Sequence, residues 1–166
     1  MQYTLTEATE KRDFQAIAAL AKGVWHNTYD SLISPAQVDY MLAKFQHVSV
    51  IENDVNQNHY RYLMAKAGDT LLGYCGIKPE ENGAVFLSKV YVIPKFHRQG
   101  IAKAMILHFA DQYRKLGYSK MWLTVNKGNK NAIAAYMKLG FHKSGERVTD
   151  IGEGYVMDDD TMELVL

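Results

Sequence analysis

The residues whose order suggests chemistry lie at a strand-to-helix turn in the second half of the chain. Residues 91–102 read Tyr-Val-Ile-Pro-Lys-Phe-His-Arg-Gln-Gly-Ile-Ala, a β-branched strand followed by a loop and a helix start at Gly100 and Ala102. The first amides of a helix lack internal partners, and together with the helix dipole they bind anions. Arg98 and Lys103 add positive charge here. The pattern predicts a phosphate-binding turn; the alternative is an ordinary connection in which small residues only serve packing.

Two common nucleotide motifs do not fit this turn. No Gly-Lys-Ser/Thr sequence follows the loop, so it is not a Walker motif. The third glycine of a dinucleotide fingerprint is also missing, and the strands before the turn read as antiparallel.

The elements that must position the turn can be read from hydrophobic periodicity and turn residues. Strands are predicted at residues 2–7, 60–67, 70–79, 84–93, 120–126, 141–150 and 161–166. Helices are predicted at residues 14–26, 35–45, 102–116 and 129–139. Residues 47–59 are polar and could form a short helix or a loop. The order β-α-α-β-β-β-α-β-α-β-β predicts an α+β fold, a mixed and mostly antiparallel sheet of about seven strands with helices on both faces.

Composition narrows the class of protein. The chain has 166 residues, 48% of them hydrophobic and 22% charged, which suits a single globular domain spanning residues 1–166. A net charge of +1 gives no chain-wide basic surface for nucleic acid. The lone Cys75, predicted to be a buried strand residue, and the absence of a His-x-x-x-His pair argue against a metal site. No secretory signal or apolar membrane span is evident, so a cytoplasmic protein is expected.

Two sequence blocks carry a resemblance to a known family. Residues 90–102 and the helix after them resemble the acetyl-CoA motif of the GNAT superfamily of N-acetyltransferases, Gln/Arg-x-x-Gly-x-Gly/Ala. The motif reads His97-Arg98-Gln99-Gly100-Ile101-Ala102 here, with His97 departing from the pattern at the first position. Residues 123–126 followed by 131–141, which end in Leu-Gly-Phe, are similar to the family's next strand and helix.

The resemblance implies acetyl-CoA as cosubstrate and direct transfer of its acetyl group to an amine. It implies that the strands at 84–93 and 120–126 splay apart, so that the backbone of the first can pair with the pantetheine arm. The amide of Val90 or its neighbour would polarise the thioester carbonyl. Tyr136 would protonate the leaving thiolate, although a plain core aromatic is the alternative. The residues expected to bind the cosubstrate are Val90, Tyr91, Val92, His97, Arg98, Gln99, Gly100, Ile101, Ala102, Lys103, Asn131 and Tyr136.

The resemblance leaves the group that takes the amine's proton unassigned. Related enzymes often carry a glutamate on the strand that corresponds to residues 84–93. The matching positions here hold Phe86 and Ser88, with Lys89 beside them. The candidates are Glu80, Glu81, Asp158, Asp159, Asp160 and an ordered water chain. The three aspartates are otherwise expected to form a solvated turn.

The acceptor side is predicted at the end of the first helix. Trp25 and Tyr29 would line the acceptor pocket, with core packing as the alternative for Trp25. Residues 25–29 and 154–164 resemble the bacterial spermidine/spermine N-acetyltransferase branch, so a polyamine or another small amine is the expected acceptor. The alternatives are a peptide or protein N-terminal amine, and a non-catalytic acyl-CoA-binding sensor. The resemblance also admits a homodimer.

Overall fold

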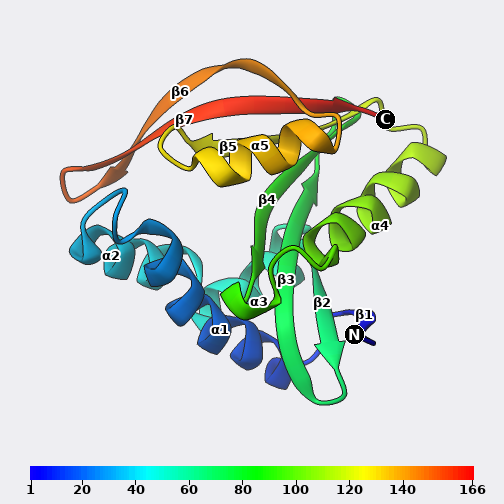
Figure 1. Ribbon diagram of the computed structural model, residues 1–166, viewed down its shortest axis with the longest axis horizontal. Helices are drawn as coiled ribbons and strands as arrows, with labels where there is room; N and C mark the ends of the chain where they lie inside the picture. The colour runs from blue at the N-terminus through cyan, green and yellow to red at the C-terminus, as the bar shows by residue number, and fades with distance from the viewer.

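One seven-stranded sheet runs through the chain and carries helices on both faces (Figure 1). All 166 residues are described by a computed structural model. The strands are β1 Thr4–Glu7, β2 Arg61–Ala67, β3 Thr70–Pro79, β4 Ala84–Val92, β5 Lys120–Asn126, β6 His142–Gly152 and β7 Tyr155–Val165. The helices are α1 Lys11–Tyr29, α2 Pro35–Phe45, α3 Val48–Gln57, α4 Ile101–Lys115 and α5 Lys130–Lys138, with a short 3₁₀ turn at Pro94–Phe96. The predicted α+β class is confirmed.

The strands lie in the order β1-β2-β3-β4-β5-β7-β6. Every neighbouring pair is antiparallel except β4 and β5, which are parallel because α4 connects them across one face of the sheet. The one parallel pair therefore sits in the middle of the sheet, immediately beside the start of α4.

Alternate residues of a strand pack into two separate cores, one on each face of the sheet. On β2, Leu63 and Ala65 pack into the core beneath α4, whereas Tyr62 and Met64 pack into the core beneath α1. This is the two-residue period of a strand that is covered on both faces. Figure 1 shows α1, α2 and α3 on one side of β2–β4 and α4 on the other.

Capping residues help to fix where a helix begins. Ser34 Oγ accepts from the amide of Gln37 at 3.1 Å, and Pro35 occupies the first turn of α2. The ambiguous polar segment forms α3, in which Ile51 is fully buried against the α1-side core. None of the helices combines the length and apolar character that a membrane crossing requires.

The final hairpin differs from the prediction. β7 begins at Tyr155 rather than at residue 161, so Asp158, Asp159 and Asp160 lie within a strand and not in a solvated turn. Three adjacent carboxylates disfavour a strand when they are read locally. Here β7 pairs with β6 from Tyr155 to Glu163, and Lys127 and Lys143 offset the charge of Asp158 and Asp160.

The tip of this hairpin rests on α2. Gln37 Nε2 donates to the carbonyl of Val156 at 2.7 Å, and the Tyr40 hydroxyl donates to the carbonyl of Ile151 at 2.6 Å. Ile151 is buried in the α1-side core. These contacts hold β7 in place opposite the end of α1.

Candidate active site

The central parallel strands part after a short stretch of pairing. β4 and β5 pair only from Ala84–Phe86 to Lys120–Trp122, and both strands then continue without each other. The edge of β4 that faces β5 is therefore open from Leu87 to Val92. An open strand edge offers amides and carbonyls to an extended ligand.

A bulge lies at the start of the open edge. Leu87 pairs with Ile77 and Lys89 pairs with Gly76, so that Ser88 is an extra residue in β4. Such a bulge bends a strand and redirects its side chains. Lys89 and Tyr91 consequently face the α1 side of the sheet.

The predicted phosphate turn carries a continuous run of unused donors. No amide from Arg98 to Lys103 donates a hydrogen bond within the chain, and α4 has no side-chain cap. Arg98 adopts a φ of +63° and Gly100 a φ of +78°, and turns of this kind can direct successive amides toward a bound anion. A non-glycine residue in the left-handed region is strained, and such strain is concentrated at ligand sites.

His97 closes this loop onto the open strand. Its Nε2 donates to the carbonyl of Val92 at 2.7 Å. The departure from the family pattern at this position therefore places an imidazole against the end of β4. Val90, Tyr91 and Val92 lie along the part of β4 that does not pair with β5.

The two residues predicted on α5 lie in different environments. Asn131 is exposed in the first turn, and the helix cap is instead Asn129, whose Oδ1 accepts from the amide of Ala132 at 3.3 Å. Tyr136 is half-buried against Phe141, with ring centroids 5.6 Å apart. The hydroxyl of Tyr136 has no hydrogen-bond partner in the chain. Burial raises the pKa of Tyr136, so the phenol stays protonated at neutral pH.

Three tyrosines from distant segments meet where the strands part. The hydroxyls of Tyr29 and Tyr91 are 2.8 Å apart. The nearby charge of Tyr29 adds to the rise of the Tyr136 pKa, and Tyr136 in turn adds to that of Tyr91. Tyr29 and Tyr91 pack against the α1-side core and Tyr136 against the α4-side core, and these three residues are called the tyrosine cluster below.

Trp25 belongs to the core, which was the alternative left open for it. Only 3% of its surface is exposed, and its Nε1 donates to the hydroxyl of Tyr74 at 3.1 Å. Tyr74 donates to Gln46 at 2.6 Å, and Gln46 donates to Tyr62 at 3.2 Å. This buried chain fixes the floor beneath Tyr91. Cys75 on β3 is fully buried, as predicted.

Lys89 occupies the place beside the missing glutamate of β4. Its Nζ donates to Ser88 Oγ at 2.7 Å and lies 5.0 Å from the ring centroid of Tyr60. No carboxylate pairs with it. Burial therefore lowers the pKa of Lys89 to about 8.

The glutamates considered as proton acceptors are placed away from the cluster. Glu80 Oε1 accepts from Trp122 Nε1 at 2.6 Å, and Trp122 stacks on Phe86 with centroids 4.4 Å apart. Glu80 thus secures the end at which β4 and β5 still pair. Glu81 is exposed in the preceding turn.

Of the three aspartates, Asp159 is the most buried and the one without an ion pair, while Asp160 Oδ1 is buried without a hydrogen bond. Asp158 pairs with Lys127 at 3.0 Å and Asp160 with Lys143 at 3.3 Å. Asp159 is 4% exposed, and its carboxylate makes no hydrogen bond or ion pair within the chain. Burial raises the pKa of Asp159 to about 6. The three-aspartate segment was the only sequence signal for this residue, and it was expected to form a turn.

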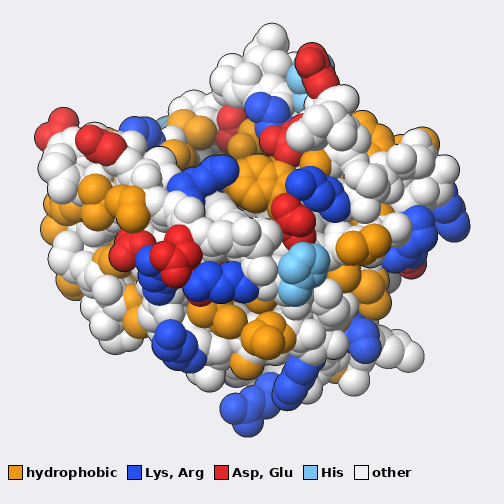
Figure 2. Space-filling view, turned by 90° about the horizontal axis from the view of Figure 1, so that it is seen from above, with side chains coloured by type: hydrophobic (Ala, Val, Ile, Leu, Met, Phe, Trp, Pro, Cys, Tyr) orange, Lys and Arg blue, Asp and Glu red, His pale blue; other side chains and the backbone are white.

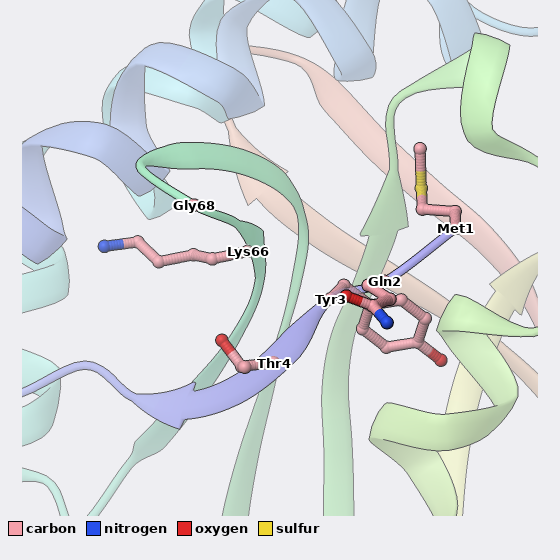
Figure 3. Close-up of a pocket in the computed structure, with 6 residues that line it drawn as sticks. All are labelled: Met1, Gln2, Tyr3, Thr4, Lys66 and Gly68. Carbon is pink, nitrogen blue, oxygen red and sulfur yellow. The ribbon is translucent and has the colours of Figure 1, made fainter.

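An apolar patch and a pocket lie on the surface of the molecule. On the face shown in Figure 2, acidic and basic side chains lie side by side around a central apolar patch. Figure 3 shows the residues that line a pocket at the β1 edge of the sheet, along β1 and the end of β2. Its lining residues are Met1, Gln2, Tyr3, Thr4, Lys66 and Gly68. It brings together none of the predicted site residues.

The sequence is similar to those of known acetyltransferases. The model of the acetyltransferase (GNAT) family matches residues 25–141. The chain is 38% identical over 58 residues, 35% of its length, to the [ribosomal protein bS18]-alanine N-acetyltransferase of Escherichia coli K12. It is 30% identical over 96 residues, 58% of its length, to an uncharacterized N-acetyltransferase of Mycobacterium bovis. The matches span 39% and 62% of those relatives.

A solved structure covers the whole chain. The PaiA N-acetyltransferase of Thermoplasma acidophilum, in complex with coenzyme A, superimposes with a TM-score of 0.81 and 19% identity, covering 100% of both chains. This likeness shows that the fold is shared from end to end.

Proposed function

The chain belongs to the acetyltransferase (GNAT) family, and we propose that it transfers the acetyl group of acetyl-CoA to a primary amine of a small molecule, with a polyamine as the leading acceptor. The observation that carries the proposal is the run of unused amides from Arg98 to Lys103, set at the end of the open edge of β4. The amides suit a phosphate group and the open strand edge suits an extended chain, so a ligand that combines the two fits both.

The residues present fit acetyl-CoA, which would supply an activated thioester. The amides of the phosphate turn would hold the pyrophosphate, with Arg98 and Lys103 adding charge. The backbone of Val90, Tyr91 and Val92 would bind the extended arm, and the amide of Val90 or its neighbour would polarise the carbonyl. Asn131 is exposed near the start of α5 and would donate to the arm. His97 would act indirectly, by tying the loop to Val92.

Tyr136 supports the role of proton donor to the leaving sulfur. Its hydroxyl is free of partners, and its raised pKa keeps the proton on the oxygen until a thiolate appears. The hydroxyls of Tyr29 and Tyr91 are hydrogen-bonded to each other, so Tyr136 is the member of the cluster with an uncommitted proton.

The polyamine assignment draws on where two sequence segments lie. Residues 25–29 and 154–164 are far apart in sequence and carry the resemblance to polyamine acetyltransferases. Tyr29 of the first segment and Tyr155 and Met157 of the second pack against the same α1-side core, and the nearby charge of Asp159 raises the pKa of Tyr29. A carboxylate beside aromatic rings is a favourable site for an alkylammonium group.

The test is release of free CoA from acetyl-CoA with a panel of acceptors, together with calorimetric binding of CoA. The panel holds spermidine, spermine, simple alkylamines, amino acids and peptides that begin with alanine. Polyamine-dependent turnover is the expected result. Turnover with the alanine peptides alone would assign a peptide acceptor instead. CoA binding without turnover on any amine would overturn the enzymatic proposal in favour of an acyl-CoA sensor.

A further inference from the structure

Asp159 lies on the same face of the sheet as Tyr29 and Tyr91. It pairs with Asn126 at the end of β5, whereas the neighbouring residue Val125 packs into the α4-side core. Alternation along the strands therefore turns Asn126 and Asp159 toward α1. Tyr155 and Met157 alternate with Asp159 on the same face of β7, and both pack against the α1-side core, as Tyr29 does. The nearby charge of Asp159 also raises the pKa of Tyr29. Asp159 thus lies on the α1 side of the sheet beside the end of β5, the strand that separates β7 from the open edge of β4.

No basic group within the chain neutralises this carboxylate. The charged neighbours on β7 are Asp158 and Asp160, which oppose its ionisation. Arg147 on β6 and Lys127 after β5 favour its ionisation, but neither forms an ion pair with it. The Arg147 guanidinium lies 5.1 Å from the Trp122 ring, and Lys127 pairs with Glu146 and Asp158.

A buried carboxylate without a partner destabilises a fold, and such groups are concentrated at functional sites. Burial is the largest cause of its raised pKa, to about 6. A carboxylic group of this pKa is ionised at neutral pH and can still accept and release a proton, as a general base requires.

We infer that Asp159 is the catalytic residue that binds the acceptor's ammonium group and removes its proton, in place of the glutamate absent from β4. This inference rests on the proposed transferase activity. It commits the acceptor to a positively charged primary amine that enters between Tyr29 and β7.

The protons and bonds of this step balance. The ammonium ion gives one proton to the Asp159 carboxylate, leaving a neutral amine. The nitrogen–carbon bond then forms and the carbon–sulfur bond breaks, while Tyr136 protonates the sulfur. The surplus proton on the nitrogen passes to the Tyr136 oxygen, and Asp159 releases its proton to solvent. One proton is released in each turnover.

The test compares Asp159→Asn with the matched neighbour Asp158→Asn, using spermidine and acetyl-CoA. We expect Asp159→Asn to lower kcat/KM at pH 8 by about 100-fold or more, which is the range for loss of a general base. The wild-type profile should rise with pH through an apparent pKa near that of Asp159, and this limb should be absent from the variant. Asp158→Asn removes an exposed carboxylate and should keep the activity and a limb that lies at lower pH, because the charge of Asp158 helps to raise the pKa of Asp159.

Two further measurements separate the possible failures. Calorimetric CoA binding should be unchanged in Asp159→Asn, and its Tm at pH 8 should equal or exceed that of the wild type, because a buried charge has been removed. Full activity with an unchanged pH profile in Asp159→Asn would overturn the inference. A lowered Tm with an unchanged profile would make Asp159 structural and overturn it as well. Absence of wild-type turnover with every amine would instead count against the proposed function itself.

Discussion

The two sides of the proposed site are built from different parts of the polypeptide. The cofactor side consists of the backbone of Val90–Val92 and the amides of Arg98–Lys103, all within one stretch of chain. The acceptor side consists of side chains from α1, β4, α5 and β7, among which Tyr29, Tyr136 and Asp159 are central. A backbone site depends on local conformation, whereas a side-chain site depends on how distant segments pack. Substitutions should therefore affect the two sides separately.

The largest expected effect is a fall in the rate of acetyl transfer. Tyr136→Phe removes the proposed proton donor and should lower kcat by about 100-fold or more, within the range for loss of a general acid. CoA binding should change little. The matched control is Tyr118→Phe, because Tyr118 is also half-buried against the α4-side core and its hydroxyl has no partner. Steady-state kinetics with equal losses in both variants would rule out the donor role.

The next largest effect is expected on the affinity for CoA. Gly100→Ala places a Cβ on a residue with φ of +78°, although no atom lies within 4 Å of that position. Alanine disfavours this conformation by roughly 1–2 kcal/mol, so the free turn should relax and CoA should bind about tenfold more weakly.

Gly154→Ala is the control for that change. Gly154 has the same φ of +78° and the same open surroundings, but it lies at the β6–β7 turn. Both variants should lose similar thermal stability, and only Gly100→Ala should weaken CoA binding in a calorimetric titration. Equal weakening in both would show that the phosphate turn has no special part.

A smaller effect is expected on the acceptor side from the tyrosine pair. Tyr29→Phe breaks the 2.8 Å hydrogen bond to Tyr91. Loss of one neutral hydrogen bond corresponds to about 1 kcal/mol, so the KM for the acceptor should rise about fivefold. The KM for acetyl-CoA should stay the same. A change confined to acetyl-CoA would place Tyr29 on the cofactor side.

The smallest effect is a pH-dependent contribution to stability. His26 Nδ1 and Nε2 each lie 2.7 Å from a carboxylate, of Asp30 and Asp39 respectively, and these contacts raise its pKa. A raised histidine pKa stabilises the fold below the unfolded value of about 6.5, and the gain is lost as the pH rises through the folded value.

His26→Gln should therefore lower Tm by about 1 °C at pH 6, because the groups are largely exposed, and by less at pH 9. Thermal melts at the two pH values measure this, and Lys11→Gln on the exposed start of α1 serves as a control. An equal difference at both pH values would contradict the ion-pair account.

The difference between the two sides also explains what could be predicted from the sequence. The phosphate turn was predicted because its signal is local: a strand, a short basic loop and a glycine before a helix. The seven-stranded sheet was predicted because strand periodicity and short turns fix its antiparallel pairs, and the helix between the fourth and fifth strands fixes the parallel one.

The acceptor side was harder to predict because its residues acquire their environment from distant partners. Asp159 reads locally as part of a turn, and only the pairing of β7 with β5 and β6 buries it. Trp25 could have lined a pocket, but the Tyr74 hydroxyl, 49 residues away in sequence, draws its Nε1 into the core. No local pattern contains that information.

Calorimetric titration of CoA into three proteins tests the central claim most directly: the wild type, Gly100→Ala, and the double variant Tyr29→Phe with Asp159→Asn. If the cofactor side and the acceptor side are separate, Gly100→Ala should weaken CoA binding about tenfold, while the double variant should bind CoA within about twofold of the wild type. Weaker binding in the double variant and unchanged binding in Gly100→Ala would contradict it, because the cofactor would then depend on the side chains assigned to the acceptor.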